Sequence, residues 1–516
     1  MIWKIAKKDL LLNLMTLKFA IGAVACVLLA CVFVPILAAD YRQRSEIYNK
    51  HVIDNESELR KVKVYRNIRH TVYRPPAVLS TFSSGLERQL TDLAKIELEK
   101  VPEQSVTERK GNPYISLFEV FDVSLIFKIV ISILALLVSY DVISGEREQG
   151  TLKLMLSGET SRWQMLLGKI LGGLVTLSVP VAITFVTAVV VLLSSPMVAL
   201  SGSDWFRMGL MFVVSLAFTS VMYLLGLLFS CMAKRSAISM VLGLFVWIVF
   251  AIVIPNASVH LATQLHPLES QEKRDGRMIS LKEDLANELG DIKVDFSKAL
   301  ITSDERDVFG GYHAKRRDIY WLNAEQKLNA QAIPVKLKYA DKFWDLEHND
   351  LSSFFGQKSL AHSLSIFSPI SAYESAMAIL AGTDIGSFTH FFGAIRTHRN
   401  GVVEYIRSST NDFSSPSFFA ICTEEESAEY TRLYVRIKQA EDEQAKAEAR
   451  QALEEWEQKN PAEAASLNLQ DFPWFRYRPS PVQDIQRAIP DLTTLLIMNI
   501  VLFAVCFAAL ERYDVR

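Results

Sequence analysis

The sequence has none of the short motifs that mark common enzymes and nucleotide-binding proteins. It contains no G-x-x-x-x-G-K-[ST] phosphate loop, and the nearest string, Leu167-Gly168-Lys169, lacks the upstream glycine and the hydroxyl residue after the lysine. The H-E-x-x-H and G-x-S-x-G signatures of hydrolases are missing too. The nine histidines are scattered without the spacing of metal ligands. We therefore predict that the chain is not an enzyme and holds no metal or cofactor of its own.

Cysteine and net charge are also scarce. Of the five cysteines, only Cys422 lies in a polar region, and the other four fall in or beside apolar runs (Cys26, Cys31, Cys231 and Cys506). The polar regions must therefore fold without an internal disulfide bond. The formal net charge of −2 gives no sign of the basic surface that binds nucleic acid, so we predict no nucleic-acid partner.

Long apolar runs, by contrast, are abundant. Hydrophobic residues make up 50% of the chain, and they gather in runs near the ~20 residues that cross a hydrocarbon core of ~30 Å. The first run continues past Cys31 to Ala39, which favours an uncleaved helix over a signal peptide. The pattern predicts a mainly α, polytopic membrane protein with spans at residues 16–38, 121–142, 166–194, 208–231, 237–255 and 492–510.

The short connections between these runs indicate their orientation. Lys and Arg cluster before the first span, between the second and third, between the fourth and fifth, and after the last, whereas residues 194–205 contain neither. Because short cytoplasmic segments carry the excess of basic residues, we predict that both termini are cytoplasmic. Residues 1–15 then form an amphipathic helix at the inner interface, and residues 511–516 form a cytoplasmic tail.

Two long inserts fall on the opposite, extracytoplasmic side. Residues 40–120 combine helix with strand: alternation over 62–73 predicts strand, and the spacing of apolar residues over 86–96 predicts an amphipathic helix. Residues 256–490 are predicted to be mostly helical, with one helix ending at Pro334 and another beginning with a capping box at Thr423. The apolar stretch 366–392 is broken by Pro369, Glu374 and Gly382, so we expect an amphipathic helix near the outer membrane surface rather than a seventh span.

Charged residues also occur inside the predicted second span. Asp122 and Lys128 lie toward its outer end, six residues apart. Ionisable groups in a membrane often mark a pathway, but a lysine this close to the interface can extend its amine to the headgroups. We therefore interpret both residues as structural rather than as substrate contacts.

The stretch at residues 143–165, between the second and third spans, carries the most informative pattern. The segment Asp141-Val-Ile-Ser-Gly-Glu-Arg-Glu148 is followed by Gly150-Thr151-Leu152-Lys153-Leu154, then by Ser161-Arg162 and Gly168-Lys169. This arrangement resembles the signature of permeases of type-2 (type V) ABC exporters, although Gly158-Glu159-Thr160 stands where that family usually has a proline. In a subgroup with a large outward domain, strings similar to Arg74-Pro75-Pro76, Gly85-Leu86, Ser368-Pro369 and Ala381-Gly382-Thr383 recur.

The resemblance implies a function and a set of partners. It implies a permease that exports a hydrophobic or amphipathic substrate, paired with an identical or homologous permease in a bacterial inner membrane. Two separate ABC ATPase subunits would bind ATP and Mg²⁺ and dock on the 143–165 stretch, and a periplasmic partner would contact the outer domain. We predict that Gly150 allows a sharp turn and that Thr151 caps the next helix. The ATPase-coupling residues implied are Asp141, Glu146, Arg147, Glu148, Gly150, Thr151 and Arg162.

The residues leave a second interpretation open. Large outer inserts also suit a mechanotransmitting, scaffold or receptor membrane protein, whose extracytoplasmic domain binds a partner without passing substrate through the membrane. The E-R-E cluster followed by Gly-Thr favours coupling to an ATPase over a passive scaffold. No residue of the sequence identifies the substrate.

Overall fold

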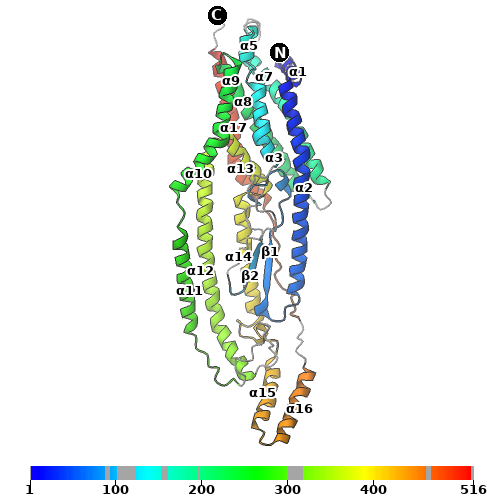
Figure 1. The fold of residues 1–516 in the computed structure, drawn as a ribbon, viewed down its shortest axis with the longest axis vertical. Helices are drawn as coiled ribbons and strands as arrows, with labels where there is room; N and C mark the ends of the chain where they lie inside the picture. Colours follow the sequence, from blue (N-terminus) through cyan, green and yellow to red (C-terminus); the bar gives the residue numbers. More distant parts are fainter. Residues whose placement is uncertain are drawn as a thin grey trace.

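The protein is an elongated, mainly helical molecule, as predicted, with the candidate membrane helices gathered at one end (Figure 1). This computed structural model describes residues 2–87, 93–100, 122–152, 161–194, 198, 200–299, 318–460 and 466–512. Among these residues six helices are long and apolar enough to cross a membrane, which agrees with the six predicted spans. They cover Leu17–Leu59, Val123–Glu148, Arg162–Leu193, Gly202–Met232, Ser236–Leu265 and Pro481–Glu511.

The first span continues far beyond the bilayer. Helix α2 (Leu17–Leu59) has 43 residues, about 65 Å at 1.5 Å per residue, so roughly half of it extends past a ~30 Å core. Before it, α1 (Ile2–Leu14) packs along the third span, α7 (Arg162–Leu193). The second span is built from α3 (Val123–Ile126), a π-helical turn η4 (Phe127–Ile131), α4 (Ser132–Ser139) and α5 (Ser144–Glu148).

The fourth span, α8 (Gly202–Met232), lies at the centre of the membrane-spanning bundle and contacts α4, α7, α9 and α17. The fifth span joins α9 (Ser236–Ile248), the π-helical turn η5 (Val249–Val253) and α10 (Ile254–Leu265), and the sixth is α17 (Pro481–Glu511). Tyr223 of α8 is fully buried, and its ring occupies the space beside Gly173 of α7, where a Cβ atom would lie 2.2 Å from it. Glycine at 173 therefore lets α7 and α8 approach closely.

Helix α13 (Pro369–Ala381) corrects the expectation for residues 366–392. It does not lie on the outside of the bundle, as an amphipathic surface helix would, but packs against α17 and α8 within the same core as the spans. The Tyr373 ring is fully buried and stacks on Phe218, in the middle of α8, with ring centroids 4.4 Å apart. Glu374 of α13 pairs with Lys128 of the second span at 2.6 Å. Because this contact neutralises both charges, Glu374 does not have to face water.

The rest of the chain forms what we call the distal region, which continues the long axis away from the spans (Figure 1). After α2 come η1 (Tyr65–Asn67), β1 (Arg69–Tyr73), η2 (Val78–Thr81) and β2 (Leu93–Glu97). The two strands pair antiparallel, with Val72 opposite Ala94. The helix expected over 86–96 is therefore wrong from Leu93 onward, because pairing with β1 overrides the helical spacing of its apolar residues.

Long helices complete the distal region. Helix α11 (Gln271–Gly290) lies along α12 (Ile319–Ser365), which runs through Pro334 rather than ending there. Helix α14 (Ile385–Ser409), the short turn η7 (Pro416–Phe418), and the hairpin of α15 (Glu424–Gln439) and α16 (Glu443–Lys459) follow. The predicted capping box at Thr423 is present, with reciprocal contacts to Glu426. This hairpin forms the end of the molecule farthest from the spans (Figure 1).

Candidate functional site

The short helix α5 and the turn after it, residues 141–151, hold six of the seven residues predicted to couple to an ATPase. We call this segment the α5 turn. Its backbone is fixed to the end of α8, because the Ser230 hydroxyl accepts hydrogen bonds from the Ile143 and Ser144 amides, each at 2.9 Å. Both amides belong to the first turn of α5, where helical amides have no partner within the helix.

Glu146 forms a buried ion pair with the third span. Its Oε1 atom lies 2.7 Å from Lys169 Nζ, and the Lys169 side chain is only 2% exposed. The same ammonium contacts the Val142 carbonyl at 3.2 Å and lies 3.6 Å from Asp9 of α1. The ammonium of Lys169 therefore joins α5, α7 and α1 at one point.

Arg147 and Glu148 bind the two helix ends that meet at the α8–α9 turn. Arg147 donates to the Cys231 and Ala233 carbonyls at 3.1 and 2.8 Å, at the C-terminus of α8. Glu148 accepts from the Ser236 amide and hydroxyl, both at 2.9 Å, at the N-terminus of α9. A cation at a helix C-terminus and an anion at a helix N-terminus each complement the helix dipole. The pair therefore holds the α5 turn to the fourth and fifth spans.

The remaining predicted residues also contact their own chain. Asp141 pairs with Lys18 of α2 at 2.7 Å, and Arg162 donates to the Glu511 carbonyl at 2.5 Å, at the C-terminus of α17. Gly150 has a φ of 74°, the left-handed conformation that favours glycine after a helix. The Thr151 hydroxyl donates to the Glu146 carbonyl at 3.2 Å, and the amides that it was predicted to cap lie outside the described residues.

The α5 turn therefore combines a fixed base with an exposed tip. Glu148, Gln149, Gly150 and Thr151 are exposed, whereas Ile143 and Ser144 are buried. Residues 153–160, the rest of the predicted docking stretch, lie outside the described residues. Sequence reasoning did not identify the partners that fix the base (Asp9, Lys18, Ser230 and Ser236), and only Lys169 was visible beforehand, as part of the Gly168-Lys169 string.

A second polar cluster lies where the spans meet the distal region, and we call it the polar junction. Three of the strings that resemble a permease subgroup come together here: Arg74 donates to the Gly382 carbonyl at 2.6 Å, and the Leu86 amide donates to the Thr383 carbonyl at 2.9 Å. Gly85 fits against Thr383 because it lacks a side chain; a Cβ atom there would lie 2.5 Å from the threonine hydroxyl. The segment 74–86 is thereby fixed to the connection between α13 and α14.

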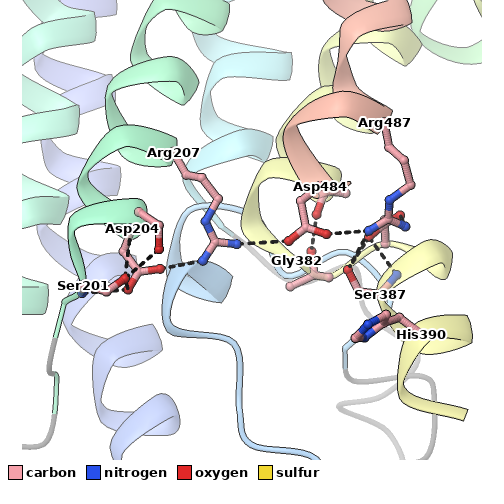
Figure 2. Close-up of polar contacts among 12 residues, drawn as sticks. Ser201, Asp204, Arg207, Gly382, Ser387, His390, Asp484 and Arg487 are labelled. Carbon is pink, nitrogen blue, oxygen red and sulfur yellow. Dashed lines mark hydrogen bonds and ion pairs between the residues drawn. The ribbon is translucent and has the colours of Figure 1, made fainter. Parts of the chain in front are cut away.

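Ion pairs extend the polar junction to α8 and α17 (Figure 2). Arg207 of α8 lies between Asp204, at 2.5 Å, and Asp484 of α17, at 3.3 Å. Asp484 also pairs with Arg487 at 2.5 Å, and Arg487 reaches Asp384, the N-cap of α14, at 2.8 Å. Side chains of alternating charge therefore link two spans, α8 and α17, to α14, the helix that follows α13.

A further polar contact lies farther along α17. Asp491, 1% exposed, is 3.0 Å from the His362 ring on α12. Asp484, Arg487 and Asp491 fall on neighbouring turns of one helix, so α17 presents a polar face to its neighbours. At the other side of the bundle Asp122 acts as the N-cap of α3 and accepts from the Ser84 amide at 2.8 Å, which supports its structural interpretation.

The family model described as ABC-2 family transporter protein matches residues 3–515 of this chain. No curated protein matches it significantly.

Proposed function

This chain belongs to the ABC-2 family of transporter proteins, and from that premise we propose that it is the permease subunit of an ATP-driven exporter. Family membership makes it a membrane permease of an ABC transporter rather than the ATPase, and associates it with an ABC ATPase subunit. The finer proposal is that two ATPase subunits dock on the α5 turn and that their ATP and Mg²⁺ sites drive this chain.

The observation that carries the proposal is the way the α5 turn is attached. Its tip is exposed, while Glu146, Arg147 and Glu148 bind α7, the end of α8 and the start of α9. A push on the tip would therefore reach three spans and α1 through short contacts between charged or hydrogen-bonded groups. Packed elements of this kind move as rigid bodies, which suits a coupling role better than a charged loop in water.

In this proposal the ATPase pushes on the exposed tip of the α5 turn and does not form ion pairs with its charged side chains. The carboxylate of Glu146 and the guanidinium of Arg147 already have partners in this chain, so exposed Gln149, Gly150 and Thr151 would meet the ATPase. In this proposal the permease acts as a dimer of identical or homologous chains in a bacterial inner membrane. Both termini lie in the cytoplasm, the distal region is extracytoplasmic, and the substrate is hydrophobic or amphipathic.

Co-purification with a matched pair of variants tests this proposal. The full-length protein is purified from its native membranes and the ATP hydrolysis of the isolated complex is measured. We expect an ABC ATPase subunit to co-purify, and we expect Arg147→Ala with Glu148→Ala to lower hydrolysis at least about tenfold, the effect of losing ~1.4 kcal/mol of coupling. The control removes an exposed charge pair of α15, Glu429→Ala with Arg432→Ala, and should leave hydrolysis unchanged. Absence of an ATPase from the purified protein, or equal effects of the two double variants, would contradict the proposal.

A second candidate function rests on the long helices. Helix α2 runs without a break from the first span into the distal region, and the polar junction ties α8 and α17 to α14. ATP hydrolysis could therefore move the distal region mechanically without any substrate crossing the membrane. Vesicle transport assays distinguish the two: if hydrolysis changes the spacing between labels on α15 and α2 but no compound moves, the mechanical function replaces the exporter.

A further inference from the structure

An open pocket of about 550 Å³ lies beside the polar junction, between the first turns of α14 and α17. It is lined by Gly386 and five residues with polar side chains, Thr389, His390, Gln483, Gln486 and Arg487. We propose that this pocket binds the headgroup of a zwitterionic phospholipid with a primary ammonium group, of the phosphoethanolamine class. The proposal concerns a lipid site and does not depend on whether the chain is an exporter.

The level of the pocket in the membrane indicates a lipid headgroup. Helix α17 has 31 residues, about 46 Å at 1.5 Å per residue, which exceeds a ~30 Å hydrocarbon core. The charged residues Asp484 and Arg487 lie in its first two turns, so these turns belong to the headgroup layer. Trp205 on the first turn of α8, 49% exposed and next to the Asp204–Arg207 pair, is the residue type enriched at that level.

The charges around the pocket indicate a zwitterion. Arg487 is flanked by two carboxylates, Asp384 at 2.8 Å and Asp484 at 2.5 Å, so its positive charge is already balanced. Lys358 also interacts with the charge of Asp384, but Arg487 is the only lysine or arginine among the residues that line the pocket. A ligand with a large net negative charge would therefore face these carboxylates without a further lining cation. A phosphate with an adjacent ammonium fits better, because the phosphate can accept hydrogen bonds from amides and imidazole while the ammonium approaches the carboxylates.

The pocket has donors and acceptors to offer such a group. The Gln483 and Gln486 side chains are exposed, and within the described residues neither amide has a hydrogen-bond partner. The His390 ring lies next to Ser387 in Figure 2, and its Nδ1 atom is 3.2 Å from the Tyr477 hydroxyl, a contact that fixes the orientation of the ring. Two amides, one oriented imidazole and the Thr389 hydroxyl thus line one opening.

An apolar track leads from the pocket along α17. Exposed apolar side chains recur at Val482, Ile489, Leu496 and Ile500, with exposed fractions between 49% and 65%. These positions are separated by seven, seven and four residues, which places them on one face of the helix. A lipid whose headgroup occupies the pocket can lay its acyl chains on this face. The continuity of polar pocket and apolar stripe favours a lipid over a soluble phosphate ester.

Lipid binding to the full-length protein tests the inference. The protein in phosphatidylcholine nanodiscs is titrated with spin-labelled phosphatidylethanolamine, phosphatidylglycerol or diacylglycerol, and the immobilised fraction of the label is measured. We expect phosphatidylethanolamine to bind at least about tenfold more tightly than the other two, a difference that Gln483→Ala with Gln486→Ala abolishes. The matched control removes two amides from the distal hairpin, Gln451→Ala with Gln458→Ala, and should keep the full preference.

Three results would overturn the inference. Equal binding of phosphatidylethanolamine and diacylglycerol would mean that no headgroup is recognised. Tighter binding of phosphatidylglycerol would replace the zwitterion with an anion. Unchanged phosphatidylethanolamine binding by the variant that lacks Gln483 and Gln486 would place the lipid elsewhere on the protein, and circular dichroism of that variant checks that it is folded.

Discussion

Lys169 and Glu146 form a buried ion pair, with 2.7 Å between the ammonium nitrogen and the carboxylate oxygen, that joins the third span to α5, the short helix at the end of the second. The two residues are 23 positions apart in the chain, and most of the predicted docking stretch, residues 143–165, lies between them. Any force applied to that stretch therefore acts on a segment whose two ends are bound to each other. This closed loop is the structural basis of the proposed coupling.

We predict that Lys169→Met destabilises the protein strongly. The substitution leaves the buried carboxylate of Glu146 without its cation and removes the nearest positive charge from Asp9, so the free energy of unfolding should fall by about 3–5 kcal/mol. Thermal unfolding in detergent measures the loss. Lys446→Met, which breaks an exposed pair with Glu443 on α16, is the control and should cost less than about 1 kcal/mol. Similar midpoints for the two variants would show that the Lys169 contacts contribute little.

A second prediction concerns Gly85 in the polar junction. A methyl group there would meet the Thr383 hydroxyl and carbonyl at 2.5 and 2.7 Å, and the residue has a positive φ of 45°. We expect Gly85→Ala to separate the segment 74–86 from the α13–α14 connection and to lower the unfolding midpoint by several degrees, corresponding to about 1–3 kcal/mol. Gly393→Ala, in the middle of α14 with open space around it, should instead raise stability by up to about 1 kcal/mol. Equal shifts in the same direction would contradict the close contact.

The distal region should lose stability in acid because of two histidines, the buried His70 and the half-buried His398. The His70 and His398 rings lie 5.2 Å apart among aromatic side chains, and burial lowers the pKa of His70 to about 3 and that of His398 to about 4. His398 lowers the pKa of His70 further, and the Asn55 amide contacts the Nδ1 atom of His70 at 3.0 Å. Both folded-state pKa values lie below the ordinary value of 6.5, so the unfolded chain binds more protons below that pH.

Because the unfolded chain binds more protons than the folded protein below pH 6.5, acid should lower the free energy of unfolding. Stability is fully present above pH 6.5 and falls as the pH drops toward 4, by up to about 1.4 kcal/mol per pH unit for each histidine. Unfolding at pH 7.5, 6 and 5, followed by circular dichroism, measures the slope. His398→Phe should reduce the slope, whereas His348→Phe, at an exposed position of α12, should not. A slope that is the same in all three proteins would rule out the buried pair as its source.

Lys128 and Glu374 should be energetically coupled across the membrane-spanning core. They lie 2.6 Å apart, with side chains 17% and 38% exposed, and they join the second span to α13. A double-mutant cycle with Lys128→Met and Glu374→Gln is expected to give a coupling energy of about 1–3 kcal/mol. The exposed pair Arg42–Glu46 on α2 provides the comparison and should give no more than about 0.5 kcal/mol. A coupling energy for Lys128–Glu374 as small as that of Arg42–Glu46 would contradict the prediction, because it would show that water screens the two ion pairs equally.

The sequence was informative where one physical constraint dominates and uninformative where distant segments meet. The six spans were predictable because a helix that crosses hydrocarbon needs an uninterrupted apolar run, whatever surrounds it. The inward packing of α13 was not predictable. Glu374 is typical of an interfacial helix, and the sequence does not show that Lys128, far away in the chain, neutralises its charge. For the same reason the α5 residues were noticed but their contacts were not: Arg147 binds carbonyls 84 and 86 residues downstream. Helix α12 likewise continues through Pro334, although proline is expected to interrupt a helix.

Cross-linking from the tip of the α5 turn tests the central claim most directly. Of the native cysteines four are buried and Cys31 is exposed, so a Cys31→Ser background allows a single thiol to be placed at Gln149→Cys, with Gln451→Cys on α16 as the control. A short bifunctional reagent is applied to native membranes, and the cross-linked proteins are identified by mass spectrometry. The account predicts an ABC ATPase subunit linked to position 149 and absent from position 451. An ATPase linked to neither position, or to both alike, would contradict it.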